Sequence, residues 1–274
     1  MTDLAERRKR GQEKTGGFGE TVRTVVYAVL IAVVVRTFAI EPFNIPSGSM
    51  IPTLLIGDYL FVSKYSYGYS KHSFPFSMGM YSGRIFGSLP ERGDVAVFKY
   101  PGDQGQGFNR TDYIKRLVGL PGDRIQVTGG VLHINGKPVE RIRIGDYARD
   151  ANGSRRGVLY NETLPNGHVH EIIETSGDTG ASDNTPEFLV PAGQYFAMGD
   201  NRDDSLDSRT QLQIRDGMGV IRLRGELGWY VPAENLVGRA EFIFFSHDPS
   251  VAGWLEPWKW PQAIRFNRFF MGIH

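Results

Sequence analysis

Two serine hydroxyls in one short turn are the first residues of this chain that could act as a nucleophile. Ser47 and Ser49 flank Gly48 in PSGSMIPTL, residues 46–54. Prolines on both sides fix the backbone, so one hydroxyl can project while nearby N–H groups converge on a developing oxyanion. Turns of Ser, Gly and Pro are common, so this segment alone is weak evidence for a nucleophile.

A lysine in a second segment could supply the base. Residues 112–123, DYIKRLVGLPGD, begin as a strand, and in a strand Tyr113, Lys115 and Leu117 share one face. This pattern turns Lys115 toward a core, where a lysine is costly unless its pKa falls. The alternative is a lysine whose amine reaches solvent or pairs with a carboxylate, and the pattern alone favours that alternative.

The composition leaves few other candidates for a base. The chain has no cysteine, and none of its six histidines lies in a block suited to a Ser-His-Asp triad. Free lysine titrates near 10.4, so only about one in 2,500 would be neutral at pH 7. Lowering the pKa of Lys115 to ~8 requires roughly 3 kcal/mol of desolvation, which apolar neighbours on its strand could supply.

Two further polar segments have competing interpretations. Residues 198–209, MGDNRDDSLDSR, can build carboxylate–guanidinium bridges that hold a loop rigid. A calcium loop of the EF-hand type would need a central Gly and a closing Glu, which this run lacks. His168 and His170 could place two imidazoles on one strand face as metal ligands, but without a third ligand nearby, exposed histidines are favoured. We therefore predict no metal and no cofactor.

Charge and composition narrow the class of protein. With 31 Lys+Arg against 30 Asp+Glu the formal charge is +1, so no global basic field attracts nucleic acid. A hydrophobic fraction of 41% is enough for a sizeable core, and 34 Gly with 15 Pro favour a turn-rich β chain over a helix bundle.

An apolar segment near the N-terminus predicts a membrane anchor. Val22–Ile40 is 19 residues long and reaches ~28 Å as a helix, provided that Arg23 and Arg36 extend from near its ends. The alternatives are a buried core helix or a removed secretory signal, but no convincing small-x-small cleavage site follows. The basic cluster at residues 7–10 places the N-terminus in the cytoplasm, and everything after Glu41 outside.

The rest of the chain shows short alternating stretches that predict strands. Asn135-Gly136 predicts a two-residue hairpin turn, and residues 147–166 and 175–186 are predicted to be loops or an exposed lobe. The strands are expected at 58–64, 94–100, 113–118, 131–134, 139, 141–144, 168–174, 193–198 and 240–245.

These observations predict a mainly β protein, with an antiparallel sheet or barrel-like catalytic domain, an inserted β-ribbon lobe and one N-terminal transmembrane helix. The predicted divisions are a basic tail at 1–21, the anchor at 22–40, a β domain at 41–123 and 193–274, and an inserted polar lobe at 124–192.

Taken in order behind the anchor, five blocks resemble the bacterial type I signal peptidase family, the membrane-bound Ser/Lys endopeptidases that remove signal peptides from exported proteins. The blocks are PSGSMIPTL, GDYLFVSK, RGDVAVFKYP, DYIKRLVGLPGD and GDNRDDSLDSR, and the closing residues 271–274 also resemble a family terminus. The resemblance covers about residues 22–274, apart from loops.

The resemblance implies a role for each matching position. Ser49 is expected to be the nucleophile and Lys115 the general base, with the Ser47 hydroxyl and the Ser49 N–H as the oxyanion hole and Ser205 orienting the lysine amine. Asp200, Arg202, Asp207 and Arg209 match ion pairs that brace the site. Shallow apolar pockets for small side chains are expected from Phe43, Ile45, Pro46, Met50, Leu54, Val97, Tyr113 and Ile114. Asp204 and Leu206 replace the Asn and Ser of many members, which makes the Ser205 loop the least secure match.

The resemblance also implies partners and a location. The substrates are expected to be secretory preproteins cut after small-x-small sites through an acyl-enzyme, with membrane lipid as the other partner and no nucleic acid. The enzyme is expected in the bacterial inner membrane as a single-pass protein, with its catalytic domain in the periplasm or outside. Aromatic and basic residues at 254–270 fit contact with lipid headgroups or core packing equally well.

Two other functions remain open at this level. A self-cleaving Ser/Lys repressor-type protease would need a scissile small-residue bond in its own linker and a DNA-binding half, and neither is evident. A catalytically inactive membrane-tethered β scaffold would bind secretory chains without cutting them, and only the presence of Ser49 and Lys115 in matching blocks argues against it.

Overall fold

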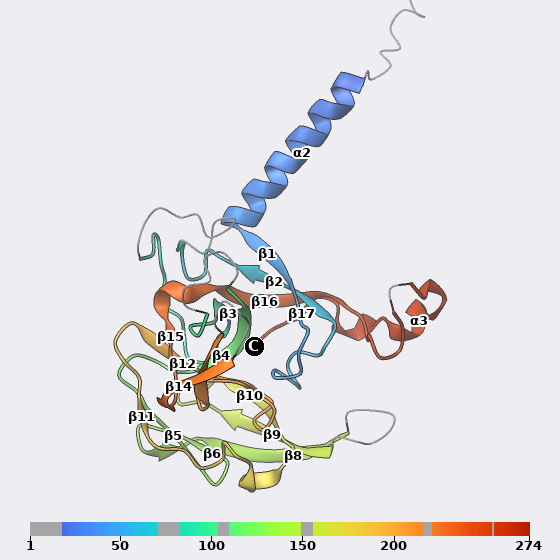
Figure 1. Ribbon diagram of the computed structural model, residues 1–274. Coiled ribbons are helices and arrows are strands. Elements are labelled where there is room, and N and C mark those ends of the chain that lie inside the picture. The colour runs from blue at the N-terminus through green and yellow to red at the C-terminus, as the bar shows by residue number, and fades with distance from the viewer. Residues whose placement is uncertain (1–17, 71–82, 104–109, 149–155, 216–220, 254) are drawn as a thin grey trace, which may run out of the picture.

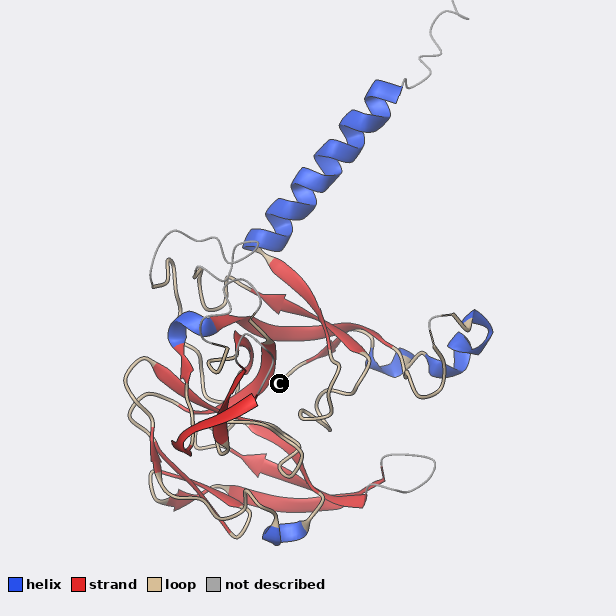
Figure 2. Cartoon of the chain, in the orientation of Figure 1, coloured by secondary structure: helices blue, strands red, loops and turns tan. Residues whose placement is uncertain are grey.

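The computed structural model describes residues 18–70, 83–103, 110–148, 156–215, 221–253 and 255–274. It consists mainly of antiparallel strands behind one long N-terminal helix (Figure 2). The predicted fold class, mainly β with an N-terminal apolar helix, is therefore confirmed.

The helix α2 spans Phe18–Phe38. It begins four residues before the start of the predicted anchor at 22–40 and ends two residues before the end of that anchor. Figure 1 shows it projecting away from the β-sheets. Its apolar side chains are exposed. Among the described residues it is the one helix long and apolar enough to cross a membrane. At its end Arg36 pairs with Glu41 at 2.8 Å, and Lys64 pairs with the same carboxylate at 2.9 Å, so the helix is tied to the first strand.

The largest sheet of the described residues has eight strands, paired antiparallel in the order β1-β2-β16-β3-β4-β12-β15, with β17 against β16. Strand β16 comes from the end of the chain but lies between β2 and β3. The strands are β1 Ile40–Asn44, β2 Asp58–Ser63, β3 Val95–Lys99, β4 Asp112–Gly119, β12 Gln194–Met198, β15 Val231–Pro232, β16 Leu236–Ser246 and β17 Met271–Gly272.

The chain between β4 and β12 forms two further sheets, of order β10-β9-β8 and β11-β5-β6-β7. Asn135 and Gly136 join β6 to β7 with φ of 55° and 75°, as the hairpin prediction requires. The strands are β5 Arg124–Thr128, β6 Val131–Ile134, β7 Lys137–Pro138, β8 Glu140–Ala148, β9 Arg156–Thr163, β10 Val169–Glu174 and β11 Phe188–Leu189.

Smaller elements complete the chain. The pair β13 Gln211–Arg215 and β14 Ile221–Leu227 forms a two-stranded ribbon. Helix α3 Trp260–Ala263 lies at the far right of Figure 1, away from the sheets. The 3-10 turns are η4 Gly177–Thr179, η5 Ala233–Asn235, η6 Pro257–Lys259 and η7 Phe266–Arg268.

One sequence prediction for the inserted region needs correction. Of the two alternatives for the segment 147–166, loops or an exposed lobe, a loop is wrong for its second half, which forms β9 and pairs with both β8 and β10. The division at residues 123–124 stays a prediction, and one apolar cluster crosses this boundary with the large sheet. That cluster joins Ile125, Leu132 and Phe188 of the inserted region to Val118 and Phe196 of the sheet.

Candidate active site

The structure brings the predicted nucleophile, Ser49, and the predicted base, Lys115, into contact although 66 positions separate them in the sequence. Ser49 lies in the turn between β1 and β2, and Lys115 lies in β4. The Lys115 amine donates a hydrogen bond to Ser49 Oγ at 2.5 Å, and a second one to the Ile114 carbonyl at 3.0 Å. Both side chains are buried, at 8% exposure for Ser49 and 4% for Lys115.

The surroundings of Lys115 favour its neutral form. Burial lowers the pKa of the amine from 10.5 to about 8, although the carboxylates of Asp207 and Asp200 act in the opposite direction. The amine also lies 5.6 Å from the centre of the Tyr113 ring, on the strand face that the sequence predicted. At this pKa about one lysine in ten is neutral at pH 7, enough for a base at neutral pH.

The loop after β12 holds the serine turn in place. Asn201 donates its backbone N–H to the Ser49 carbonyl and its side-chain amide to the Gly48 carbonyl, both at 3.1 Å. Gly199 allows this approach, because a Cβ there would lie 2.4 Å from the Ser49 carbonyl oxygen and 2.3 Å from Ser205 Oγ. Neither Gly199 nor Asn201 could be assigned a role from the sequence, although both belong to the block that contains Ser205.

The two other predicted hydroxyls differ in their surroundings. Ser47 is exposed beside Ser49, in the wall of the same pocket. The Ser205 hydroxyl is buried near Asp207 and makes no hydrogen bond to the Lys115 amine. The orientation of Lys115 by Ser205 therefore stays a prediction: no hydrogen bond joins the two in this structure, and the second hydrogen bond of the amine goes to the Ile114 carbonyl.

The four residues predicted to brace the site form buried ion pairs. Asp200 and Arg202, however, pair with residues for which the sequence predicted no role. Asp207 pairs with Arg209, at 2.9 and 2.8 Å. Asp200 accepts two hydrogen bonds from Arg116, each of 2.8 Å, and Arg202 donates two to Glu162 of β9, at 2.8 and 2.5 Å.

These pairs have strong electrostatic effects. Burial alone raises the pKa of Asp200, but the charge and hydrogen bonds of Arg116 outweigh it and leave this pKa below its ordinary value. The Arg202 guanidinium likewise outweighs burial and holds the pKa of Glu162 far below its ordinary value. The carboxylates therefore stay ionised, and the loop after β12 is fixed to β4 on one side and to β9 on the other.

The two histidines that were predicted to be exposed are not. His170 is 5% exposed, and its Nε2 lies 3.4 Å from a carboxylate oxygen of Glu162. His168 is half-buried beside Arg116. The centres of the two imidazole rings lie 5.8 Å apart. Burial and the charge of Arg116 lower the pKa of His168 to about 4. The rings pack against the ion pairs because β10 runs parallel to the loop after β12 and is hydrogen-bonded to it through Ile173, which a local pattern cannot reveal.

A pocket of about 540 Å³ opens beside the Ser49–Lys115 pair. Six of the predicted pocket residues line it, but Met50 and Leu54 lie in the core, at 1% and 0% exposure. Their spacing in the serine turn points them inward, away from the pocket. Asp204 and Leu206, which stand where many members of that family have Asn and Ser, also line the pocket. The six residues are Phe43, Ile45, Pro46, Val97, Tyr113 and Ile114.

Comparison with known proteins matches this arrangement to one family. The family model described as "Signal peptidase, peptidase S26" matches residues 18–245. The chain is 38% identical to a signal peptidase I of Rickettsia canadensis over 267 residues, covering 92% of each chain. It is 39% identical to that of Rickettsia conorii over 270 residues, covering 90% of each.

The chain therefore belongs to the signal peptidase family, peptidase S26, a family of serine peptidases that remove signal peptides. Among solved structures, a signal peptidase I from Enterococcus faecalis is 24% identical, covering 56% of this chain and 97% of its own. Its TM-score of 0.28 is too low for a comparison of the two sites.

Proposed function

We propose that the chain cleaves the signal peptides of secretory preproteins with Ser49 as the nucleophile and Lys115 as the general base. The observation that carries this proposal is the hydrogen bond of 2.5 Å between the Lys115 amine and Ser49 Oγ, in a buried site that lowers the pKa of the lysine to about 8. Because the neutral amine is accessible at neutral pH, no histidine is needed to activate the serine.

The reaction is an acyl transfer. Neutral Lys115 takes the proton of Ser49 Oγ, which attacks the scissile carbonyl to give a tetrahedral oxyanion. The Ser49 N–H and the Ser47 hydroxyl stabilise this oxyanion. Protonated Lys115 then donates its proton to the leaving amine, and a water molecule activated by the same lysine hydrolyses the acyl-enzyme.

The pocket supports a preference for small-x-small cleavage sites, in which two small substrate side chains flank one intervening residue. Its walls are mainly apolar and include the branched side chains of Ile45, Ile114 and Val97. Strand β1 ends the strand order of the large sheet, and Phe43 of β1 lines the pocket. An extended preprotein segment can therefore pair with this edge by β-augmentation.

We infer that Asp200, Arg202, Asp207 and Arg209 act by positioning. Their ion pairs hold the loop that carries Asn201, and Asn201 in turn holds the serine turn. Ser205 is inferred to position the lysine only after a small movement of its buried hydroxyl. The division into a β domain at 41–123 and 193–274 and an inserted lobe at 124–192 is supported by the change of sheet at β5.

We also propose that α2 anchors the enzyme in the bacterial inner membrane. With 21 residues the helix reaches ~32 Å, and the basic cluster at residues 7–10 supports a cytoplasmic N-terminus and an extracytoplasmic catalytic domain. Near the C-terminus Leu255, Trp258 and Phe266 are 91%, 72% and 64% exposed, which supports contact with lipid headgroups.

The test is cleavage of a precursor with an Ala-x-Ala site by the detergent-purified full chain, scored by the new N-terminus. We expect correct processing by the parent and by Ser88→Ala, an exposed serine outside the pocket, and none by Ser49→Ala. If neither the parent nor Ser88→Ala processes a precursor that a known signal peptidase cuts, the catalytically inactive scaffold becomes the better interpretation.

A further inference from the structure

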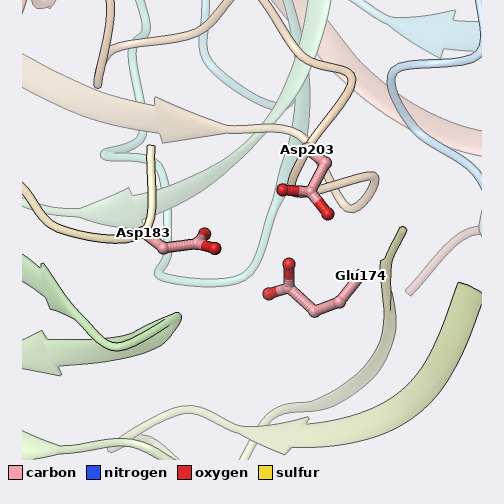
Figure 3. Close-up of side chains that lie close together, drawn as sticks. All are labelled: Glu174, Asp183 and Asp203. Atoms are coloured by element: carbon pink, nitrogen blue, oxygen red, sulfur yellow. The ribbon is translucent and has the colours of Figure 1, made fainter. Parts of the chain in front are cut away.

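Three carboxylates converge at the junction between the inserted region and the loop after β12 (Figure 3). Glu174 is the last residue of β10, Asp183 follows η4, and Asp203 comes after β12. One oxygen of each lies within 4.8 Å of the others. None of the three has a role in the reaction proposed above.

Backbone groups hold two of these carboxylates in position. Asp203 Oδ2 accepts hydrogen bonds from the N–H groups of Thr175 and Ser176, at 2.6 and 2.7 Å. Asp183 Oδ2 accepts one from the Gly180 N–H at 2.5 Å. Gly180 also makes room for the cluster, because a Cβ there would lie 2.2 Å from Asp203 Oδ1. The loops thus fix the carboxylates and leave their other oxygens to face the centre.

Two of the oxygens at the centre are buried without any hydrogen bond. Glu174 and Asp183 are 1% and 0% exposed, and Glu174 Oε2 and Asp183 Oδ1 have no partner. Figure 3 shows all three carboxylates aimed into the space that they share. A buried carboxylate oxygen without a partner is costly, and buried charges are ordinarily paired or bound to a metal.

Two arginines lie near Glu174, but neither hydrogen-bonds these two oxygens. Arg141 lies 3.5 Å from Glu174 Oε1, the other oxygen, and pairs more closely with Asp178 at 2.9 Å. Arg202 binds Glu162 through its two terminal nitrogens, and its buried Nε makes no hydrogen bond, so its charge acts on Glu174 without direct contact. Burial raises the pKa of Glu174 to about 8, so a proton is the competitor for the space between the carboxylates.

We propose that Glu174, Asp183 and Asp203 bind a calcium ion. Three carboxylates with no nitrogen or sulfur ligand suit a hard divalent cation. Mg²⁺ is ordinarily bound through one or two carboxylates and keeps several waters, whereas Ca²⁺ accepts more carboxylate ligands in a flexible geometry. Three carboxylates, with one oxygen of each within 4.8 Å of the others, therefore fit calcium better than magnesium. Water molecules would complete the coordination.

Calcium at this site would reinforce a junction that the backbone already makes. The Ile173 N–H donates to the Asp200 carbonyl at 2.9 Å, and the Arg202 N–H donates to the Ile173 carbonyl at 3.0 Å. These bonds join β10 to the loop that carries Ser205. The ion would therefore stabilise the attachment of the inserted region to that loop.

The experiment uses the full chain in detergent micelles, freed of metal with a chelating resin and titrated with CaCl₂ by calorimetry. We expect one Ca²⁺ per chain, and a rise in Tm of about 5 °C at a hundredfold excess over Kd. Glu174→Gln with Asp183→Asn should abolish both responses. Glu171→Gln, which removes an exposed carboxylate from the same strand, should retain both.

Several outcomes would overturn the proposal. A parent chain that binds no Ca²⁺ would show that a proton or water occupies the space. An undiminished response in the double variant would locate the ion elsewhere, and a response to MgCl₂ but not to CaCl₂ would reject calcium. If the double variant does not fold, Asp183→Asn alone replaces it, since its side-chain oxygen can still accept the Gly180 N–H.

Discussion

The pH dependence of cleavage gives the sharpest test of Lys115 as the base. Burial lowers the pKa of its amine from 10.5 to about 8. At pH 7 the neutral fraction is then about one in ten instead of about one in 3,000, a gain of roughly 300-fold. Because only the neutral amine can accept the Ser49 proton, kcat/KM should rise tenfold between pH 6 and 7, reach half its maximum near pH 8 and then level off.

The assay is kcat/KM for a fluorogenic peptide with an Ala-x-Ala site, measured in detergent between pH 6 and 10 at constant ionic strength. The control is Lys137→Met, which removes an exposed lysine of β7 and should leave the profile unchanged. A midpoint at pH 10 or above would refute the desolvation of Lys115. A midpoint between 6 and 7 would indicate a histidine, although His168 cannot be that group because burial lowers its pKa to about 4.

Three further predictions concern single residues. Lys115→Met should be inactive, but in urea unfolding at pH 7 it should be more stable than the parent by up to roughly 3 kcal/mol. Below pH 8 the folded parent carries the full free-energy cost of a buried charged amine. The difference in stability should therefore disappear as the pH rises from 8 to above 10.5. Gly199→Ala should lower kcat about 100-fold, because its Cβ would displace the Ser49 carbonyl, whereas an unchanged kcat would contradict this close approach. Glu162→Gln should lower the free energy of unfolding by about 3–5 kcal/mol, since it leaves Arg202 buried and charged without its carboxylate; a loss below 1 kcal/mol would mean that this pair does not brace the loop.

Local patterns predicted much of the fold. Alternation identified β2, β3 and β4, and the Asn135-Gly136 turn identified the hairpin of β6 and β7. The same alternation placed Lys115 on the face of Tyr113 and Leu117, which the structure confirms for its approach to the Tyr113 ring. These features depend on neighbours in sequence, so a strand period or a turn dipeptide is enough to find them.

The partners within the site could not be predicted in this way. Asp200 pairs with Arg116, 84 positions away, and Arg202 pairs with Glu162, 40 positions away. A sequence with 31 basic and 30 acidic residues offers many equivalent pairings, and only the packing of the loop after β12 against β4 and beside β10 selects these two. The burial of His170 has the same origin, because both the loop and β9 cover it.

The position of β16 has a consequence for the order in which the site can assemble during synthesis. The turn that holds Ser49 joins β1 to β2, whereas Lys115 lies on β4, and in the sheet β16 separates β2 from β3. Residues 236–246 are therefore translated long after both groups that they connect. Because non-local pairings form only once the last strand is present, a nascent chain still on the ribosome contains the serine and the lysine but not the sheet that joins them. Proteolytic competence should consequently appear only after β16 has been synthesised.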